Sequence, residues 1–293
     1  MVFILYLLLQ QSKITMNKIS IALLFFLGFS VMVSAQDDDR VRGDRNVTIK
    51  QTTVDPFNTI IVGEDFYVEV IYNKKPLVEV ETDDNLHDYI TFEVKDSVLT
   101  FKTTKKIVSS KKMSIKVNYT DGFQNIETRD DAEVRSLTSL ELKNASLKTS
   151  GTSKAYLNIR ADNFKFESSD RAKVKLNVNA KKVNVVLSDN SKLDAQINAP
   201  ETTFDLYQRA NADVQGAANN VVIRADNNSK FDGSNFTANT SNLTCEIASD
   251  VYIETIDSVT IDASGTSAVY LYGNPKITIN QMLDTSKLQK KVK

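Results

Sequence analysis

The sequence lacks the residues on which most catalytic and metal sites depend. Among 293 residues there is one cysteine, Cys245, one histidine, His87, and no tryptophan. One cysteine excludes an internal disulfide. The two counts together exclude most zinc sites and every Cys–His or Ser–His dyad that does not use His87. There is also no phosphate-binding loop, dinucleotide fingerprint or nucleophile elbow. We therefore expect a protein that has no cofactor and is not an enzyme.

Neither sign of charge predominates. The chain has 36 basic and 37 acidic residues, which gives a formal net charge of −1. A nucleic-acid-binding protein usually carries a basic patch or a strong basic excess, so we expect no nucleic-acid partner.

The N-terminus has the pattern of a secretory signal peptide. Met16-Asn17-Lys18 is a short basic segment, an apolar run follows over 19–33, and Val33-Ser34-Ala35 fits a cleavage site. The run is too short for a spanning helix. We expect residues 1–35 to be removed near Ala35, leaving an extracytoplasmic chain without an integral membrane span. Two interpretations of residues 1–15 stay open: a natural start at Met16, or a longer signal or membrane anchor.

The next segments alternate in polarity as strands do. Residues 36–50 are polar and predict a linker. From residue 57 to 119 apolar and polar residues alternate with period two, for example at Phe66, Val68 and Val70. This alternation predicts half-buried strands. We assign 51–128 to an N-terminal, irregular part of the fold. His87 lies in a polar turn of this region, where we expect it to be solvated.

From about residue 150 the sequence repeats itself. Small residues follow one another at steps of 18 to 20, most often 19, and other columns keep the same step two and four residues later. The small column is Ser153, Ala172, Ser191, Ala210, Ser229, Ser249 and Ser267. A hairpin meander would not hold one step through several strand segments, whereas coils stacked about 4.8 Å apart would.

The repeat predicts an all-β, right-handed parallel β-helix. It is a single-stranded solenoid with coils of about 19 residues, regular over 129–275, with irregular N-terminal coils and with 276–293 as a C-terminal cap and basic tail. A step of 19 is not a multiple of six, which disfavours a left-handed hexapeptide helix. Two residues before each small residue stands a turn residue, mostly of a type that tolerates left-handed backbone. These turn residues are Gly151, Asp170, Asp189, Gln208, Asn227, Ile247 and Gly265.

Three motifs resemble a known family. They are Val54-Asp55-Pro56-Phe57-Asn58-Thr59-Ile60, the repeated turns Ser150-Gly151-Thr152-Ser153 and Ser264-Gly265-Thr266-Ser267, and the closing Tyr270-Leu271-Tyr272-Gly273-Asn274-Pro275. With these the chain resembles the auto-transporter adhesin head GIN domain family, mostly from Bacteroidetes. The resemblance implies a right-handed β-helix without catalytic residues and a role in adhesion. Most turn glycines of the family pattern are Asp, Asn or Gln here, which should not alter the fold.

One outward column is acidic. Asp194, Asp213 and Asp232 follow one another at one-coil steps between apolar columns. Stacked carboxylates repel one another unless a cation or a base lies beside them. Lys192 and Lys230 stand two residues before the first and the third, and we expect them to balance the charge on a solvated face. A Ca²⁺ site or the acidic trio of a polysaccharide hydrolase is the alternative.

Exposed tyrosines are the candidate binding residues. Tyr252, Tyr270 and Tyr272 occupy outward positions near the C-terminal end, as Tyr156 does earlier in the chain. Tyrosine stacks on sugar rings and on protein partners, although it is also common on sheet surfaces. Cys245 falls in an inward column, where it should be buried and inert.

Three functions are consistent with this sequence. The first is a non-catalytic adhesion or surface-binding module for a polysaccharide, a host or cell-surface protein, or another copy of the chain. The second is a carbohydrate-active enzyme on a β-helix, and the third is a structural envelope protein. An enzyme would need acidic or basic groups converging in a groove. The coils here keep an almost constant length, so we favour the binding module.

Overall fold

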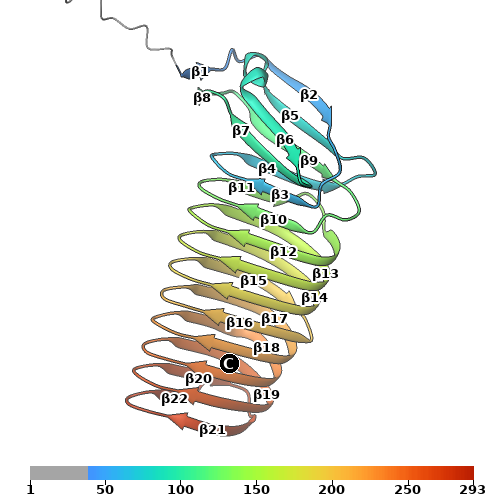
Figure 1. The fold of residues 1–293 in the computed structure, drawn as a ribbon. Coiled ribbons are helices and arrows are strands. Elements are labelled where there is room, and N and C mark those ends of the chain that lie inside the picture. The colour runs from blue at the N-terminus through green and yellow to red at the C-terminus, as the bar shows by residue number, and fades with distance from the viewer. Residues whose placement is uncertain (1–38) are drawn as a thin grey trace, which may run out of the picture. The chain divides into compact units, whose positions relative to one another are not determined.

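The computed structural model describes residues 39–293, and within it Arg42–Lys293 form one compact unit. The protein is 67% strand and 2% helix, and it forms a β-solenoid of about 9 turns whose coils are roughly 19 residues apart. The coils wind in a right-handed sense (Figure 1). The predicted fold is therefore confirmed. The predicted signal peptide, with its cleavage near Ala35, lies outside the described residues. Over the described part of the chain, no helix is long and apolar enough to cross a membrane.

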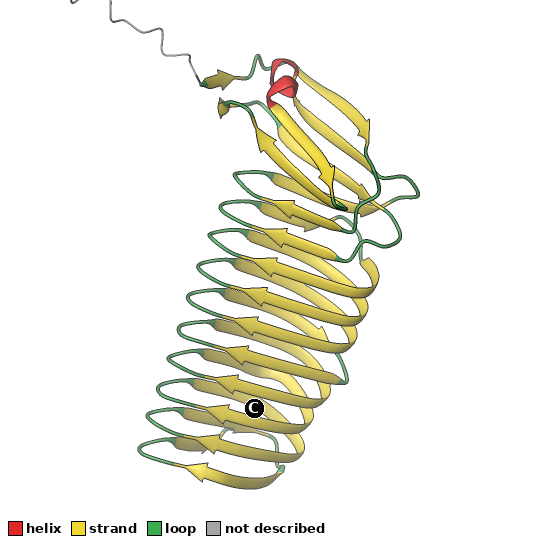
Figure 2. Cartoon of the chain, viewed as in Figure 1, coloured by secondary structure: helices red, strands yellow, loops and turns green. Residues whose placement is uncertain are grey.

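About two thirds of the described residues are in strands, and the only helix drawn is the short η2 (Figure 2). The elements are β1 (Arg40–Arg42), β2 (Val47–Thr53), β3 (Thr59–Val62), β4 (Tyr67–Tyr72), β5 (Leu77–Asp83), η2 (Asp84–Tyr89), β6 (Ile90–Lys95), β7 (Val98–Thr103), β8 (Lys106–Ser109), β9 (Met113–Tyr119), β10 (Asn125–Thr128), β11 (Glu133–Ser136), β12 (Leu140–Thr149), β13 (Lys154–Ser168), β14 (Lys173–Leu187), β15 (Lys192–Asn198), β16 (Glu201–Leu206), β17 (Asn211–Ala225), β18 (Lys230–Cys245), β19 (Asp250–Ala263), β20 (Ala268–Tyr272), β21 (Lys276–Met282) and β22 (Lys287–Lys290).

Each regular coil consists of two strand segments that bury alternate residues. In β14 the pattern runs exposed–buried from Lys173 to Asn179, bends, and resumes to Leu187. Neighbouring coils pair in parallel at the predicted step, so that Val174 lies beside Leu193 and Leu187 beside Leu206. The inward columns of all coils form one continuous hydrophobic core. A coil buries its apolar residues only when its neighbours are present, which explains why the sequence must keep its step.

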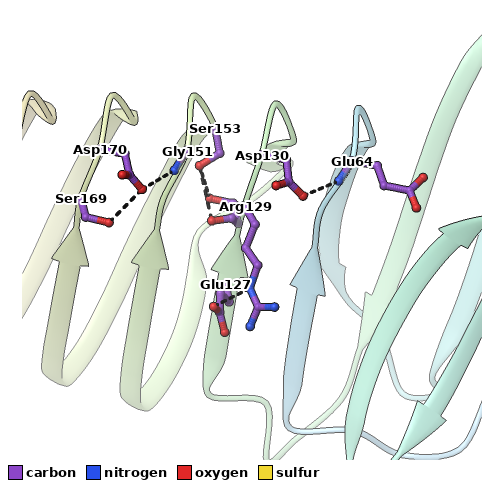
Figure 3. A network of polar contacts seen from close by, with 9 residues as sticks. Glu64, Glu127, Arg129, Asp130, Gly151, Ser153, Ser169 and Asp170 are labelled. Atoms are coloured by element: carbon purple, nitrogen blue, oxygen red, sulfur yellow. Dashed lines mark hydrogen bonds and ion pairs between the residues drawn. The ribbon is translucent and has the colours of Figure 1, made fainter.

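One corner of every coil is a turn in left-handed backbone. All seven predicted turn residues, from Gly151 to Gly265, have a positive φ between 58° and 69°. Aspartate carries a second advantage here, because its carboxylate accepts a hydrogen bond from the turn of the preceding coil. Asp170 accepts from the Gly151 N–H at 2.9 Å (Figure 3), and Asp189 accepts from the Asp170 N–H at 3.1 Å. At these two turns the side chain thus satisfies a backbone donor that glycine would leave to water.

The N-terminal region differs from the irregular coils that the sequence predicted. Only β3 and β4 form a true coil, since they pair in parallel with β10 and β11. Strands β2, β5 and β9 pair antiparallel, and so do β6 and β7. This region is therefore an N-terminal cap in which antiparallel pairs are joined to the first coil by the parallel pairs of β3 with β7 and of β4 with β9. The alternation of period two is the same in both kinds of sheet, so it could not distinguish them.

Two predicted boundaries also need correction. The polar linker expected over 36–50 overlaps β2, which begins at Val47 because Val47-Thr48-Ile49 is rich in β-branched residues. At the other end, the segment expected as a cap and tail continues the solenoid: β21 and β22 pair in parallel with β19 and β20. Ile277 and Ile279 of this last coil are 43% and 48% exposed.

Candidate functional site

The outer face of the first strand segment carries one continuous row of polar and aromatic side chains, which we call the axial ladder. Each member pairs in register with the next, because strand alternation places the same position of every coil outward. The axial ladder runs Glu69, Arg135, Tyr156, Lys175, Asp194, Asp213, Asp232, Tyr252, Tyr270 and Gln289. The predicted adjacency of the three aspartates and of Tyr252 with Tyr270 is thus observed.

The acidic part of the ladder is partly neutralised. Asp194 pairs with Lys175 at 2.9 Å, and Asp232 pairs with Lys230 at 3.0 Å. Lys192, which we expected beside Asp194, does not pair with it. Lys175, the member of the axial ladder before Asp194, takes that place. Asp213 has no ion pair within residues 39–293. Burial, followed by the charges of Asp232 and Asp194, raises its pKa.

The arrangement of the aspartates does not favour a metal centre. In the described part of the chain, no three His, Cys, Asp or Glu side chains lie close enough together to hold a metal ion. The three carboxylates lie in a line along the sheet face, two of them engaged by lysines. This speaks against the alternative of a Ca²⁺ site formed by Asp194, Asp213 and Asp232.

We expect Asp213→Asn to stabilise the protein at pH 7 by about 0.5 kcal/mol, because like charges on adjacent strands are destabilising and solvent screening keeps the effect small. The raised folded-state pKa means that ionised Asp213 opposes folding at neutral pH. That penalty fades as the pH falls through the folded-state pKa. Urea unfolding of both proteins between pH 3 and pH 8 measures this.

Calcium supplies the control for this prediction. A cation that binds the folded state raises the melting temperature by mass action, so we expect millimolar Ca²⁺ to leave the wild-type melting temperature unchanged. A rise with Ca²⁺ that disappears in Asp213→Asn would establish the cation site instead.

Tyr252 and Tyr270 form a closed stack. Their ring centroids are 4.1 Å apart and the rings are inclined by 10°. The Lys230 Nζ lies 5.0 Å from the Tyr252 centroid, and the Lys291 Nζ lies 4.9 Å from the Tyr270 centroid. The sequence of contacts is therefore Lys–Tyr–Tyr–Lys, and each ring has a neighbour on both faces. Stacking of a sugar on these rings, which the sequence suggested, would have to displace a lysine.

What the pair offers a ligand is its rim and its hydroxyl groups. Burial and a side-chain hydrogen bond with Tyr270 raise the pKa of Tyr252 to about 12, so the Tyr252 hydroxyl stays protonated at neutral pH. Tyr272 is not part of the stack. It lies in the next outward column, paired in register with Glu254, whose carboxylate accepts from Thr237 at 2.7 Å.

A shallow groove, which was not predicted from the sequence, lies further along the same face. It has a volume of about 500 Å³ and is bordered by the ladder residues Arg135, Tyr156, Lys175 and Asp194 on one side. A column of amide side chains, Asn158, Asn177, Gln196 and Gln215, borders it on the other. These amides also follow the 19-residue step, so the repeat itself carried the signal.

Cys245 and His87, the two side chains of the most reactive types, have structural roles. Cys245 is fully buried, as expected, and burial raises its pKa to about 12. The expectation of a solvated His87 is wrong: it is 9% exposed in η2, and its Nε2 lies 3.0 Å from the Thr48 hydroxyl oxygen of β2. Burial and the charge of Lys50 lower its pKa. Neither side chain reaches the outer face.

The repeated turns and the closing segment agree with a family comparison. The model of the family described as "Putative auto-transporter adhesin, head GIN domain" matches residues 56–196 and 167–275. The chain belongs to this family. No curated protein matches.

Several solved structures share the fold of this chain. A "putative adhesin" from Parabacteroides merdae is 16% identical, with 87% of this chain and 100% of that chain covered and a TM-score of 0.64. A "putative adhesin" from Parabacteroides distasonis is 17% identical, with 85% and 99% covered and a TM-score of 0.65. A "Putative lipid binding protein" from the same species is 12% identical, with 86% and 100% covered and a TM-score of 0.64. At such identities the likeness concerns the fold alone.

Proposed function

We propose that the chain is a non-catalytic, extracytoplasmic adhesion module that binds a polymeric or multivalent partner through the outer face of the solenoid. The predicted signal peptide and the membership of the GIN-domain family support the location and the role. Every coil repeats its outward chemistry, so the face offers many similar weak contacts along a line. Repeated contacts suit a polysaccharide, a surface protein with repeated epitopes, or a second copy of the chain.

The observation that carries the proposal is the stack of Tyr252 and Tyr270 between Lys230 and Lys291. Four side chains hold each other in place, so little conformational entropy is lost when a partner docks on their rim. Tyrosine is enriched at interfaces because its ring buries apolar area while its hydroxyl makes a hydrogen bond. Tyr272, in the adjacent column, extends the same patch.

Catalysis is the less favoured alternative. A glycosidase holds two carboxylic groups on either side of the scissile bond, whereas Asp194, Asp213 and Asp232 follow one another along a single column. Within the described residues, His87 and Cys245 are buried away from this face. No pair of facing acid and base groups supports a turnover mechanism on the outer face.

The test is a binding array of glycans and matrix proteins probed with the purified protein. We expect the double variant Tyr252→Ala with Tyr270→Ala to bind its partner at least tenfold more weakly, with an unchanged melting temperature. Tyr252→Phe with Tyr270→Phe should lose a comparable amount, because the hydroxyls rather than the ring faces are accessible.

Tyr207→Ala is the matched control, since the Arg224 guanidinium likewise lies 5.8 Å from the Tyr207 ring centroid, and it should bind as the wild type does. Equal binding by the double alanine variant would remove this patch from the interface. Reproducible turnover of a glycan that is lost in Asp213→Asn would replace the module by an enzyme, and an array without any partner would favour a structural role.

A further inference from the structure

The groove beside Tyr156 differs from the tyrosine stack in both position and chemistry. It spans five consecutive coils, on β11, β13, β14, β15 and β17, whereas the stack lies on β19 and β20. Its floor is the outer face of the first strand segments, whose backbone groups are engaged in the parallel ladder, while the Asn158 N–H donates to the Ser136 hydroxyl at 2.9 Å. A ligand in the groove therefore meets side chains alone.

The amide column is the distinctive wall of this groove. Asn158, Asn177, Gln196 and Gln215 pair in register, so one exposed primary amide recurs at each coil, about 4.8 Å from the next. None of the four side-chain amides donates to or accepts from another residue within 39–293. Each amide offers two donors and one acceptor oxygen, which are left to solvent or to a ligand.

Amides elsewhere on the solenoid behave differently. On the other strand segment, Asn163 donates to the Asn144 side chain at 2.9 Å, and Asn220 donates to Glu201 at 2.7 Å. An outward amide can therefore form a hydrogen bond with an amide or a carboxylate of the neighbouring coil. All four amides of the groove column lack such a bond, as Asn184 and Asn242 do on the other strand segment, so within the described part of the chain they are available to a ligand.

The opposite wall carries charges that are already paired. Arg135 donates to Glu133 at 2.6 Å, and its guanidinium lies 4.3 Å from the Tyr156 ring centroid. Lys175 pairs with Asp194 at 2.9 Å. Since each cation has an anionic partner, the groove offers no uncompensated charge to a sulfate, a carboxylate or a phosphate.

From these features we infer that the groove is a binding subsite for an uncharged polysaccharide that lies along the solenoid axis. Its hydroxyl groups both donate and accept, which matches a row of amides, and its repeating units match a row with one amide per coil. A nucleic acid would need uncompensated cations, and a peptide strand would need unpaired backbone groups. The inference rests on the proposed binding role but uses residues that the tyrosine patch does not share.

Affinity electrophoresis of the full chain tests the inference. The probes are dextran, galactomannan and hydroxyethylcellulose as uncharged polymers, and alginate and heparin as anionic ones. We expect at least one uncharged polymer to retard the protein, with no dependence on salt. Asn177→Ala with Gln196→Ala should weaken that retardation at least tenfold, because two adjacent rungs of the row are removed.

The matched control is Asn184→Ala with Asn242→Ala, which removes two outward amides from the other strand segment and should leave binding within twofold of wild type. Retardation by none of the uncharged polymers, stronger and salt-sensitive retardation by the anionic ones, or full binding by the Asn177 and Gln196 variant would each overturn the inference. The proposed adhesion role would survive any of these results if the array partner still depended on the tyrosines.

Discussion

Leu187→Asp should lower the free energy of unfolding by at least about 3 kcal/mol, because it places a carboxylate in the core without a partner. Leu187 is fully buried, and in its column it lies between Ser168 and Leu206 of the adjacent coils. Neither neighbour carries a charge. Burial will raise the folded-state pKa of the introduced carboxyl, so the variant should regain part of its stability as the pH falls. Urea unfolding followed by circular dichroism at pH 4 and pH 7 measures both effects.

Asn184→Asp is the control for this variant, since Asn184 lies on the outward side of the same strand, β14. It should change stability by less than about 0.5 kcal/mol. Equal stability of the two variants would contradict the alternation and the 19-residue step on which the whole description of the solenoid depends.

Gly216→Ala should cost about 3 kcal/mol or more, through backbone strain and a direct overlap. Gly216 has a φ of +114°, which side chains rarely adopt, and a Cβ here would overlap the carbonyl oxygen of Ile197 in the preceding coil. To relieve the overlap, two coils would have to separate at a point where they share parallel hydrogen bonds. Thermal unfolding of the purified variant gives the measurement.

Gly122→Ala separates the two contributions. Gly122 has a φ of +94°, and nothing lies within 4 Å of the position of its Cβ. That variant should lose only the strain, about 1 to 2 kcal/mol. If both alanine variants lose the same amount of stability, the overlap with the Ile197 carbonyl does not contribute to the cost of Gly216→Ala.

The step of 19 allowed much of the fold and part of the site to be predicted. It correctly placed Leu187 beside Leu206, Asp194 beside Asp213, and Tyr252 beside Tyr270. Registers of this kind follow from counting, because like positions in stacked coils must be neighbours. The turn column was predictable for the same reason, even at Ile247, where a β-branched residue takes a φ of 61°.

Contacts between residues that are not related by the 19-residue step could not be predicted. Lys291 covers one face of Tyr270 from a coil that the sequence had assigned to a tail. His87 is buried because its neighbour Thr48 comes from β2, a strand that the polar composition had concealed. Pairing in the N-terminal cap depends on strands that are distant in sequence and follow no common spacing. In each case the deciding contact lies between segments that share no periodicity.

The turn at the corner of every coil also governs how such a chain can change its length. A coil contacts the coils before and after it, and the turn at this corner has the same left-handed backbone conformation in each regular coil. Duplication or loss of a whole repeat therefore preserves every kind of contact and moves the far end by about 4.8 Å. A gain or loss of one residue must instead be absorbed locally, as in β18, which has one residue more than β17 between Asp232 and Asn235. In evolution the length of such a solenoid therefore changes by whole coils, whereas the side chains of its outer face change by single substitutions.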